Sequence, residues 1–345
     1  MTHPPIIAAR NLTKRFPIRS GNVLTGRPPA SLNAVEDVSL EVHAGEAVGL
    51  VGESGCGKST LSRLLCRLID ASSGQILIDG QEVSGISSAA FARSPLRRDI
   101  QMVFQDPTDS LNPRFSVFDL IADPLRQLDP PGSRAALRRQ VEATAASVNL
   151  SPELLSRFPH QLSAGQKARV GIARAMIVEP RLLVLDEPTS ALDVSVQATV
   201  LQLLNRIRRD QGVALLFVSH DLDVVRLLCS RIIVMYLGQI VESGDTASLF
   251  QAPAHPYTKA LLSAILSPRG REHRDRIRLD GDPQSPIDPT GLKCRLYGRC
   301  PAQQGICGQS EPELRPFGDG RQVRCHLADP EQIPSATPQK GPPDA

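Results

Sequence analysis

The sequence has little excess charge, no long apolar run and no clustered basic stretch. Its 39 lysine and arginine residues nearly balance 36 aspartate and glutamate residues, for a formal net charge of +3. A charge this small gives no argument for a nucleic-acid partner. No stretch approaches the ~18 uninterrupted apolar residues of a membrane span, and the opening segment MTHPPIIAARNLTKRF lacks the apolar core of a signal peptide. We therefore expect a cytosolic, soluble protein.

The seven cysteines are unevenly spread. Cys56, Cys66 and Cys229 lie far apart, and we expect them to be buried or half-buried residues without chemistry. The others gather near the end of the chain, in CRLYGRCPAQQGIC and VRCHL, as Cys294, Cys300, Cys307 and Cys325. Because cytosolic thiols are kept reduced, such a cluster is more often metal-binding or catalytic than disulfide-bonded.

A phosphate-binding loop is the strongest motif. The apolar run Ala47 to Val51 leads into GESGCGKS, which matches the pattern G-x-x-x-x-G-K-[ST]. The next segment places leucine and isoleucine at helical spacing from Leu61 to Ile69. A buried strand, a glycine loop and an amphipathic helix in this order are the context that the motif requires. A chance glycine loop is the weaker interpretation.

Such a loop binds nucleotide phosphates, because its backbone N–H groups curl around phosphate oxygens and the helix N-terminus adds partial positive charge. We expect Lys58 to reach the β and γ phosphates, Ser59 to hold Mg²⁺ and Thr60 to donate to the α phosphate. The remaining loop residues of the predicted site are Gly52, Ser54, Gly55, Cys56 and Gly57.

Two carboxylates follow a second apolar run. In RLLVLDEPTSALD, the run Leu182 to Leu185 places Asp186 and Glu187 at the end of a buried strand, where ligands bind in open α/β sheets. Asp186 suits outer-shell coordination of Mg²⁺, and Glu187 suits polarising a water for attack on the γ phosphate. A third run, VALLFVSHD, ends on His220. This convergence favours a shared site over the alternative of a carboxylate pair that caps a turn.

Further motifs identify a family. Ser163 and Gln166 in HQLSAGQKARVGIARAMIVEP form a capping-box pattern, and the helix that it opens is predicted to run to Glu179. Together with VGESGCGKST, VFQDP, LVLDEPTSALD and VSHD, this segment makes residues 6–265 resemble the ATP-binding subunit of ABC transporters. The resemblance implies an α/β P-loop ABC ATPase fold with a RecA-like parallel-sheet core, an antiparallel β subdomain and a helical subdomain at about residues 106–178.

The resemblance also implies a site shared between two subunits. Gln105 would sense Mg²⁺, the attacking water and the membrane subunit, and His220 would contact the γ phosphate. Asp193 would belong to the loop that links the two sites. The signature, a helix N-terminus, would face the γ phosphate bound by the opposite subunit. It comprises Ser163, Ala164, Gly165 and Gln166.

Two features fit the family less directly. Phe16 in NLTKRFPI is an aromatic residue suited to grip adenine, and a place in the core of a β-strand suits it equally. The signature has Ala164 where the family usually has glycine, and Gln161 stands where an acid is usual. Since the alanine methyl group crowds a phosphate that glycine lets approach, we expect the site completed by this signature to be the weaker of two.

Three segments narrow the resemblance to the oligopeptide/dipeptide importer branch: QMVFQDPTDSLNPR, HPYTKALLSAI and GDPQSPIDP. In that branch four cysteines of a C-terminal extension bind a [4Fe–4S] cluster, which places a structural cluster here in residues 266–328. The thiolates themselves leave zinc and unligated thiols as alternatives, although the spacing lacks a short C-x₂₋₄-C pair. Residues 329–345, rich in proline and polar residues, are predicted to be disordered.

We therefore predict an ATPase subunit that uses ATP and Mg²⁺, carries a [4Fe–4S] cluster and energises import of oligopeptides or dipeptides. Its expected partners are a second, related ATPase subunit in a heterodimer, two transmembrane permease subunits and, through the assembled complex, an extracytoplasmic solute-binding protein. Its expected place is the cytoplasmic face of the inner membrane. Another cargo such as nickel complexes is the main alternative.

Two rival functions are disfavoured. A soluble ABC ATPase that acts on nucleic acid or ribosomes would usually add coiled-coil arms or a second ATPase half, and this sequence has dispersed basic residues and neither addition. A non-catalytic subunit on the same fold is disfavoured by the intact Glu187 and His220, although Ala164 keeps that alternative for half of the shared site.

Overall fold

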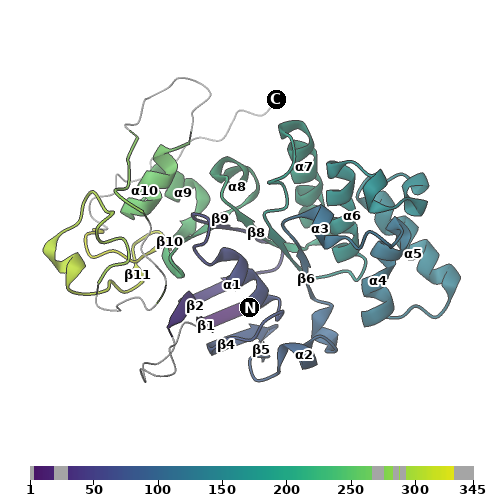
Figure 1. Ribbon diagram of the computed structural model, residues 1–345, viewed down its shortest axis with the longest axis horizontal. Coiled ribbons are helices and arrows are strands. Elements are labelled where there is room, and N and C mark those ends of the chain that lie inside the picture. The colour runs from purple at the N-terminus through teal and green to yellow at the C-terminus, as the bar shows by residue number, and fades with distance from the viewer. Residues whose placement is uncertain (1–3, 19–29, 266–275, 283–286, 288–292, 330–345) are drawn as a thin grey trace.

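Figure 1 shows the computed structural model, which describes residues 4–18, 30–265, 276–282, 287 and 293–329. Residues 330–345 of the predicted disordered tail lie outside these ranges, as do the first half of the charged segment RGREHRDRIRLDGD and most of GDPQSPIDP. Most of the glycine- and proline-rich segment after Phe16 also lies outside them. No helix in the described ranges is long and apolar enough to cross a membrane.

In the part of the chain that the structure describes, the central sheet has eight strands in the order β11-β12-β10-β9-β3-β8-β7-β6. Its parallel part comprises β9 (Arg231–Tyr236), β3 (Ala47–Val51), β8 (Ala214–Ser219), β7 (Leu182–Asp186) and β6 (Ile100–Val103). Every residue of β3, β6, β7 and β8 is buried, as expected for parallel strands covered on both faces. The predicted convergence is confirmed, because β3, β8 and β7 are neighbours and run in one direction.

A second sheet, with four antiparallel strands among the described residues, has the order β2-β1-β4-β5. The strands are β1 (Ile7–Pro17), β2 (Ser31–Val42), β4 (Ser73–Ile78) and β5 (Gln81–Glu82). Buried residues of this sheet, such as Leu40, share one apolar cluster with Leu50 of β3 and Leu61 of the first helix. The two sheets are thereby fixed to each other by the segment that carries the phosphate loop.

Two helices are shorter than the sequence predicts. Helix α1 (Lys58–Leu65) was expected to extend through Ile69, but Arg67 takes a positive φ of 53°. Helix α6 (Ala164–Met176) was expected to reach Glu179, whose φ is 54°. A residue in the left-handed region cannot continue a right-handed helix, so both predicted ends are wrong by about one turn.

The helices between β6 and β7 pack together beside the central sheet, on the right in Figure 1. They are α3 (Pro107–Ser110), α4 (Val117–Leu128), α5 (Arg134–Ser147), η3 (Pro152–Ser156), η4 (Pro159–Gln161) and α6. Their apolar faces share a core with the sheet, where Ile121, Val141 and Ile172 are buried. The remaining helices are α2 (Ser88–Phe91), η2 (Pro95–Arg97), α7 (Val194–Gln211), α8 (Leu222–Leu228), α9 (Thr246–Gln251), α10 (Pro256–Ser263) and η5 (Gly305–Gly308).

The cysteine-rich extension continues the central sheet, on the left in Figure 1. Strand β10 (Gln239–Asp245) pairs with β9 through a turn at Gly238, near the turn that the sequence predicts. Strand β12 (Gln322–Val323) pairs with β10, and β11 (Arg315–Pro316) pairs with β12. Within its described residues, the extension has one small apolar cluster of its own, built around Phe317. The sequence predicts little apolar core in the extension. Pairing with β10 gives the extension the stabilisation that this small cluster alone does not provide.

Candidate functional site

The phosphate loop connects β3 to α1 and depends on glycine at two close approaches. Gly52 and Gly57 have φ values of 154° and 106°. A Cβ atom would lie 2.2 Å from the carbonyl oxygen of Met235 at Gly52, and 2.1 Å from that of Ala34 at Gly57. Because these distances leave no room for a side chain, glycine at both positions lets the loop sit against β9 and β2.

The ammonium group of Lys58 is held by the loop itself. Its Nζ donates to the carbonyl oxygens of Gly52 and Glu53, at 2.7 and 2.9 Å, and the residue is only 5% exposed. The Cys56 Sγ lies 3.9 Å from the same nitrogen, and burial raises the pKa of this thiol. The lysine is therefore in place to meet an anion over the loop, while Cys56 is a buried filler, as are the other two isolated cysteines.

A buried carboxylate adjoins the loop. Ser59 Oγ donates to Asp186 Oδ1 at 3.1 Å. Burial raises the pKa of Asp186, the hydrogen bond from Ser59 opposes this rise, and the charge of Glu187 adds to it. A divalent cation at this point would offset the cost of burying the carboxylate, and hydroxyl and carboxylate oxygens suit Mg²⁺. Ser59 and Asp186 therefore fit the magnesium site that the sequence predicts.

The side chains of Gln105 and His220 meet that of Glu187, the residue that follows β7. Gln105 Nε2 donates to Glu187 Oε2 at 3.2 Å, and His220 Nδ1 lies 3.3 Å from the same oxygen. The φ of Glu187 is 47°, which is uncommon for a residue other than glycine and recurs at functional sites. Its N–H donates to the Val218 carbonyl oxygen at 3.0 Å, which holds this backbone against β8. The fold thus brings three separate motifs to one carboxylate.

A cavity of about 230 Å³ lies over the phosphate loop. Phe16 borders it from β1, half-buried, with the Lys14 ammonium 4.9 Å from its ring centroid. This position favours contact with a nucleotide base over a place in the apolar core of the protein. The other predicted site residues that line the cavity are Ser54, Gly55, Gly57, Lys58, Ser59, Thr60, Gln105 and Glu187.

The signature residues lie at the start of α6. Ser163 Oγ accepts from the Gln166 N–H at 3.3 Å and Gln166 Oε1 accepts from the Ser163 N–H at 2.9 Å, which confirms the capping box. Asp193 caps α7, with its Oδ1 accepting from the Val196 N–H at 3.0 Å. A Cβ at Gly165 would lie 2.5 Å from Val196 Cγ1. The starts of α6 and α7 therefore touch, and in the described chain neither contributes to the lining of the cavity.

The four cysteines of the extension are neighbours. The Cys294 N–H donates to the Cys307 carbonyl oxygen at 2.9 Å. Burial raises the pKa of Cys294 to about 11, and the thiols of Cys307, Cys325 and Cys300 add to this rise. Among the residues that the structure describes, no three His, Cys, Asp or Glu side chains form a group that could hold a metal ion. The predicted [4Fe–4S] site is therefore not supported by side-chain geometry, although the thiols gather as the sequence suggests.

Sequence reasoning missed one wall of the cavity. This wall comes from the start of β2 and from the β9–β10 turn, namely Leu32, Asn33, Ala34, Leu237 and Gly238. Of these residues, only Gly238 could be placed in a turn from the sequence, because a glycine between two apolar runs predicts a turn. Nothing in the spacing shows that this turn faces the phosphate loop.

A lysine and a hydroxyl in a glycine loop, with carboxylates at the end of a parallel strand, form an arrangement that binds and hydrolyses nucleoside triphosphates. The fold and site thus define the class of P-loop nucleotide hydrolases. The profile of the family described as "ABC transporter" matches residues 35–190, and that described as "Oligopeptide/dipeptide transporter, C-terminal region" matches residues 241–307. This chain belongs to the ATP-binding proteins of ABC transporters, in the oligopeptide/dipeptide branch.

Individual relatives agree with this placement. The chain is 44% identical to the probable peptide ABC transporter ATP-binding protein y4tS of Sinorhizobium fredii, over 96% of this chain and 93% of that protein. It is 43% identical to the oligopeptide transport ATP-binding protein OppF of Salmonella typhimurium, over 94% of this chain and 97% of that protein. A solved dimeric ATP-binding cassette, MJ0796, bound to ADP and Pi, superposes with a TM-score of 0.62 at 27% identity, over 70% of this chain and 98% of that one. ATP hydrolysis is accordingly the expected activity.

Proposed function

We propose that this chain hydrolyses ATP to energise the import of oligopeptides or dipeptides by an ABC transporter. The proposal rests mainly on the similarity of this chain to the OppF protein. The aligned region covers 94% of the chain and so includes both the ATPase motifs and the extension. The match of residues 241–307 to the C-terminal region of oligopeptide/dipeptide transporters supports the same class of cargo.

In this proposal Glu187 polarises the water that attacks the γ phosphate, and its contacts with Gln105 and His220 support that role. Lys58 binds the β and γ phosphates, while Ser59 and Asp186 hold Mg²⁺, which supplies positive charge to the phosphates when bound. Positioning and charge stabilisation then supply most of the catalysis. Phe16 contacts the base.

The complete site requires two ATPase subunits in this proposal. The signature at residues 163–166 and Asp193 lie at the starts of α6 and α7, apart from the cavity of their own chain, which supports a role at the cavity of a second, related ATPase. A helix N-terminus is suited to an anion such as a γ phosphate. Two permease subunits and a solute-binding protein complete the transporter, and the chain works at the cytoplasmic face of the inner membrane.

We also propose that Cys294, Cys300, Cys307 and Cys325 hold a [4Fe–4S] cluster. The support is the gathering of four thiols in one small segment, where each of Cys294, Cys300 and Cys325 has its pKa raised by burial and by neighbouring thiols. Soft thiolate ligands suit iron–sulfur clusters, and a bound cluster would replace the protons that these groups hold at neutral pH. Its role would be to tie together the loops of the extension.

Uptake in living cells tests the cargo. Cells that lack this chain would be supplied with the wild-type chain or with the Glu187→Gln variant, and would be given labelled dipeptides, labelled pentapeptides or radioactive nickel. We expect the wild-type chain to restore peptide uptake and the Glu187→Gln variant not to restore it. Normal peptide uptake without the chain, or restoration of nickel uptake only, would refute the peptide cargo and leave the ATPase standing.

Metal analysis tests the cluster. The wild-type chain and Cys300→Ser would be purified without oxygen and analysed for iron, sulfide and zinc. We expect about four irons per wild-type chain, together with sulfide, and a large loss in the variant. Cys56→Ser is the matched control, because that thiol is buried at the phosphate loop and far in sequence from the cluster. Zinc, or no metal, in the wild-type chain would rule the cluster out.

A further inference from the structure

Three of the four clustered cysteines each adjoin a buried arginine in the sequence. The pairs are Cys294 with Arg295, Cys300 with Arg299, and Cys325 with Arg324. The three arginines are 8 to 9% exposed. Since a buried guanidinium group is stable only when it is paired, its partners show what it holds in place. In all three cases at least one partner belongs to the ATPase part of the chain.

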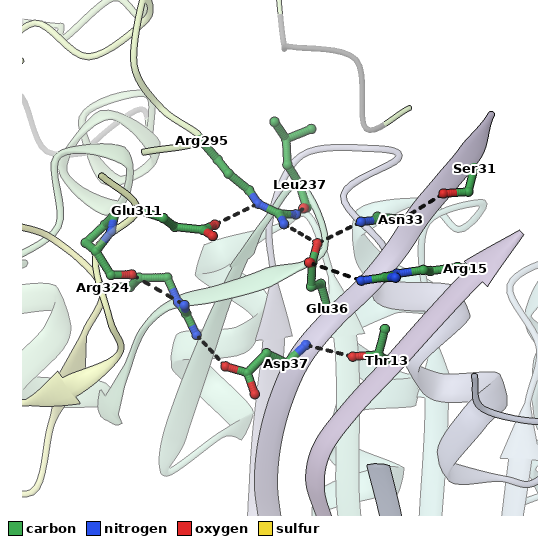
Figure 2. Close-up of polar contacts among 11 residues, drawn as sticks. Thr13, Arg15, Ser31, Asn33, Glu36, Asp37, Leu237, Arg295, Glu311 and Arg324 are labelled. Atoms are coloured by element: carbon green, nitrogen blue, oxygen red, sulfur yellow. Dashed lines mark hydrogen bonds and ion pairs between the residues drawn. The ribbon is translucent and has the colours of Figure 1, made fainter. Parts of the chain in front are cut away.

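Arg295 contacts one wall of the nucleotide cavity. Its guanidinium donates to the Glu36 carboxylate and to the Leu237 carbonyl oxygen, while its Nε donates to Glu311 at 3.2 Å (Figure 2). Glu36 in turn accepts from Asn33 Nδ2 at 3.0 Å. Because Asn33 and Leu237 both line the cavity, Arg295 joins the two segments that form this wall, the start of β2 and the β9–β10 turn.

The Glu36 carboxylate is the bridge in this contact. Burial by itself would raise the pKa of Glu36, but the hydrogen bond and the charge of Arg295 outweigh burial, with Asn33 and Arg15 adding to them, so that this pKa lies below its ordinary value. The Glu36 N–H also donates to the Gly238 carbonyl oxygen at 2.9 Å, and Gly238 lines the cavity. Glu36 is therefore charged at neutral pH and attached to the wall through both its backbone and its side chain.

Arg299 reaches the phosphate loop itself. Its Nη1 lies 3.3 Å from Glu53 Oε2 and 3.0 Å from the Tyr236 hydroxyl oxygen. The Tyr257 hydroxyl oxygen accepts from the Glu53 N–H at 2.8 Å, and the Glu53 carbonyl oxygen accepts from Lys58 Nζ at 2.9 Å. The N–H, the carbonyl and the carboxylate of Glu53 thus each have a partner. Two of these partners come from outside the loop.

We propose that Arg295 and Arg299 are positioning residues of the ATP site, through which the cysteine-rich extension sets the affinity for nucleotide. Arg295 acts through Glu36 on the wall of the cavity, and Arg299 acts through Glu53 on the loop that carries Lys58. In the described chain neither arginine lines the cavity, so both act through another residue. The proposal rests on ATP binding at this cavity and requires neither the peptide cargo nor the iron–sulfur cluster.

The clustered thiols lie beside the two arginines in the sequence. Arg295 and Arg299 are each one peptide bond from a clustered cysteine, and Cys294 and Cys300 also pack against the main apolar core. The clustered thiols and both guanidinium groups are therefore carried by the same short stretches of backbone.

The test compares ATP binding by the purified full-length chain and by two variants, Arg295→Gln and Arg299→Gln. Arg324→Gln is the matched control, because Arg324 is equally buried and also flanks a clustered cysteine. It donates to the carbonyl oxygens of Ile240 and Pro312, which do not line the cavity in the described chain, and lies 3.6 Å from Asp37.

We expect each test variant to raise the Kd for ATP by about tenfold, as befits the loss of charge-assisted hydrogen bonds, and the control to leave it within about twofold. In the assembled transporter, KM for ATP should rise more than kcat falls, because the arginines hold the site and do not touch the reacting atoms. A thermal unfolding curve for each variant separates this effect from a general loss of stability.

An unchanged Kd for ATP in both folded test variants would overturn the proposal. An equal rise of the Kd in Arg324→Gln would also overturn it, because the effect would then come from a general loosening of the extension. Where a test variant does not fold, Glu36→Gln and Glu53→Gln remove the negative charge from the same ion pairs on the ATPase side. We expect a similar rise in Kd from each of these, and unchanged binding in both would also overturn it. A wild-type chain that binds ATP but supports no peptide uptake refutes only the proposed cargo, so the two failures are distinguishable.

Discussion

His220 Nδ1 lies 3.3 Å from Glu187 Oε2, across the ends of the neighbouring strands β8 and β7. The same oxygen accepts a hydrogen bond from Gln105 at 3.2 Å. Two side chains from distant parts of the sequence thus fix the orientation of one carboxylate. A carboxylate held in this way is suited to orient a water molecule for attack.

Replacing Glu187 with glutamine tests this role. The amide keeps the shape of the side chain but loses the charge that polarises the water, so we expect ATP binding to persist and phosphate release to fall by about 10²-fold or more. Nucleotide binding and phosphate release would both be measured in the assembled transporter. The control is Glu153→Gln, an exposed carboxylate of η3. Unchanged hydrolysis in Glu187→Gln would count against the assignment.

Ala164 is the first residue of α6 and is exposed. If its methyl group crowds the phosphate bound by a partner ATPase, Ala164→Gly should raise the ATPase rate of the assembled transporter severalfold, where tenfold corresponds to about 1.4 kcal/mol of barrier. The helix itself should lose up to about 1 kcal/mol of stability. An unchanged rate would mean that the methyl group does not crowd this phosphate.

Gly165 and Gly171 lie on the same helix but have different surroundings. A Cβ at Gly165 would lie 2.5 Å from Val196 Cγ1, whereas a Cβ at Gly171 would meet Val103 Cγ1 at 3.9 Å, an ordinary contact. We expect Gly165→Ala to destabilise the fold by about 1–3 kcal/mol. Gly171→Ala should be neutral or stabilising, by up to about 1 kcal/mol.

Denaturant unfolding would measure both glycine variants. A second change, Val196→Ala, removes the atom that the new Cβ meets, and we expect it to restore most of the stability of Gly165→Ala. Equal stability of the two single variants would show that α6 and α7 can move apart at this point without cost.

His255 gives the fold a predicted dependence on pH. It is 2% exposed, and its Nδ1 accepts from the Tyr257 N–H at 3.1 Å at the start of α10. Burial lowers its pKa from 6.5 to about 3. Between these values the unfolded chain binds a proton that the folded chain does not, so the contribution of His255 to stability is complete above pH 6.5 and is lost as pH falls toward 3.

The slope of this loss is up to about 1.4 kcal/mol per pH unit. His255→Asn keeps a side-chain acceptor for the Tyr257 N–H and cannot titrate, so we expect a shallower fall in stability over the same pH window. Urea unfolding at several pH values would measure it. His43→Asn, at an exposed position, is the matched control and should leave the slope of the wild-type chain unchanged. Equal slopes in all three chains would contradict the assignment.

Several parts of the site that were predicted from sequence lie within short segments. Lys58 and Ser59 are neighbours in one loop, and Asp186 and Glu187 follow one strand, because phosphate chemistry requires these groups at adjacent positions. The burial of the parallel strands also follows directly from their unbroken apolar runs. Chemistry that is local in space and local in sequence can therefore be predicted without coordinates.

The parts that were missed join residues far apart in the chain. Arg299 and Glu53 are 246 positions apart, and Arg295 and Glu36 are 259 apart. Each arginine is an ordinary charged residue in a polar segment, and only the placement of the extension on β10 makes it a buried partner of the ATPase. The early ends of α1 and α6 were missed for a related reason, because a left-handed residue such as Arg67 or Glu179 leaves no signature in the spacing of apolar residues.

The pairing of β12 with β10 has a consequence for how the chain behaves among its copies. Without the extension, the edge of β10 that faces away from β9, where Glu242 and Ser243 now pair with β12, would present unpaired N–H and C=O groups at the border of the large sheet, and such an exposed edge promotes aggregation. The outermost strand, β11, has only two residues, and Pro316 among them has no N–H to offer a further strand. A strand of a neighbouring molecule therefore cannot readily pair with β11 and extend the sheet.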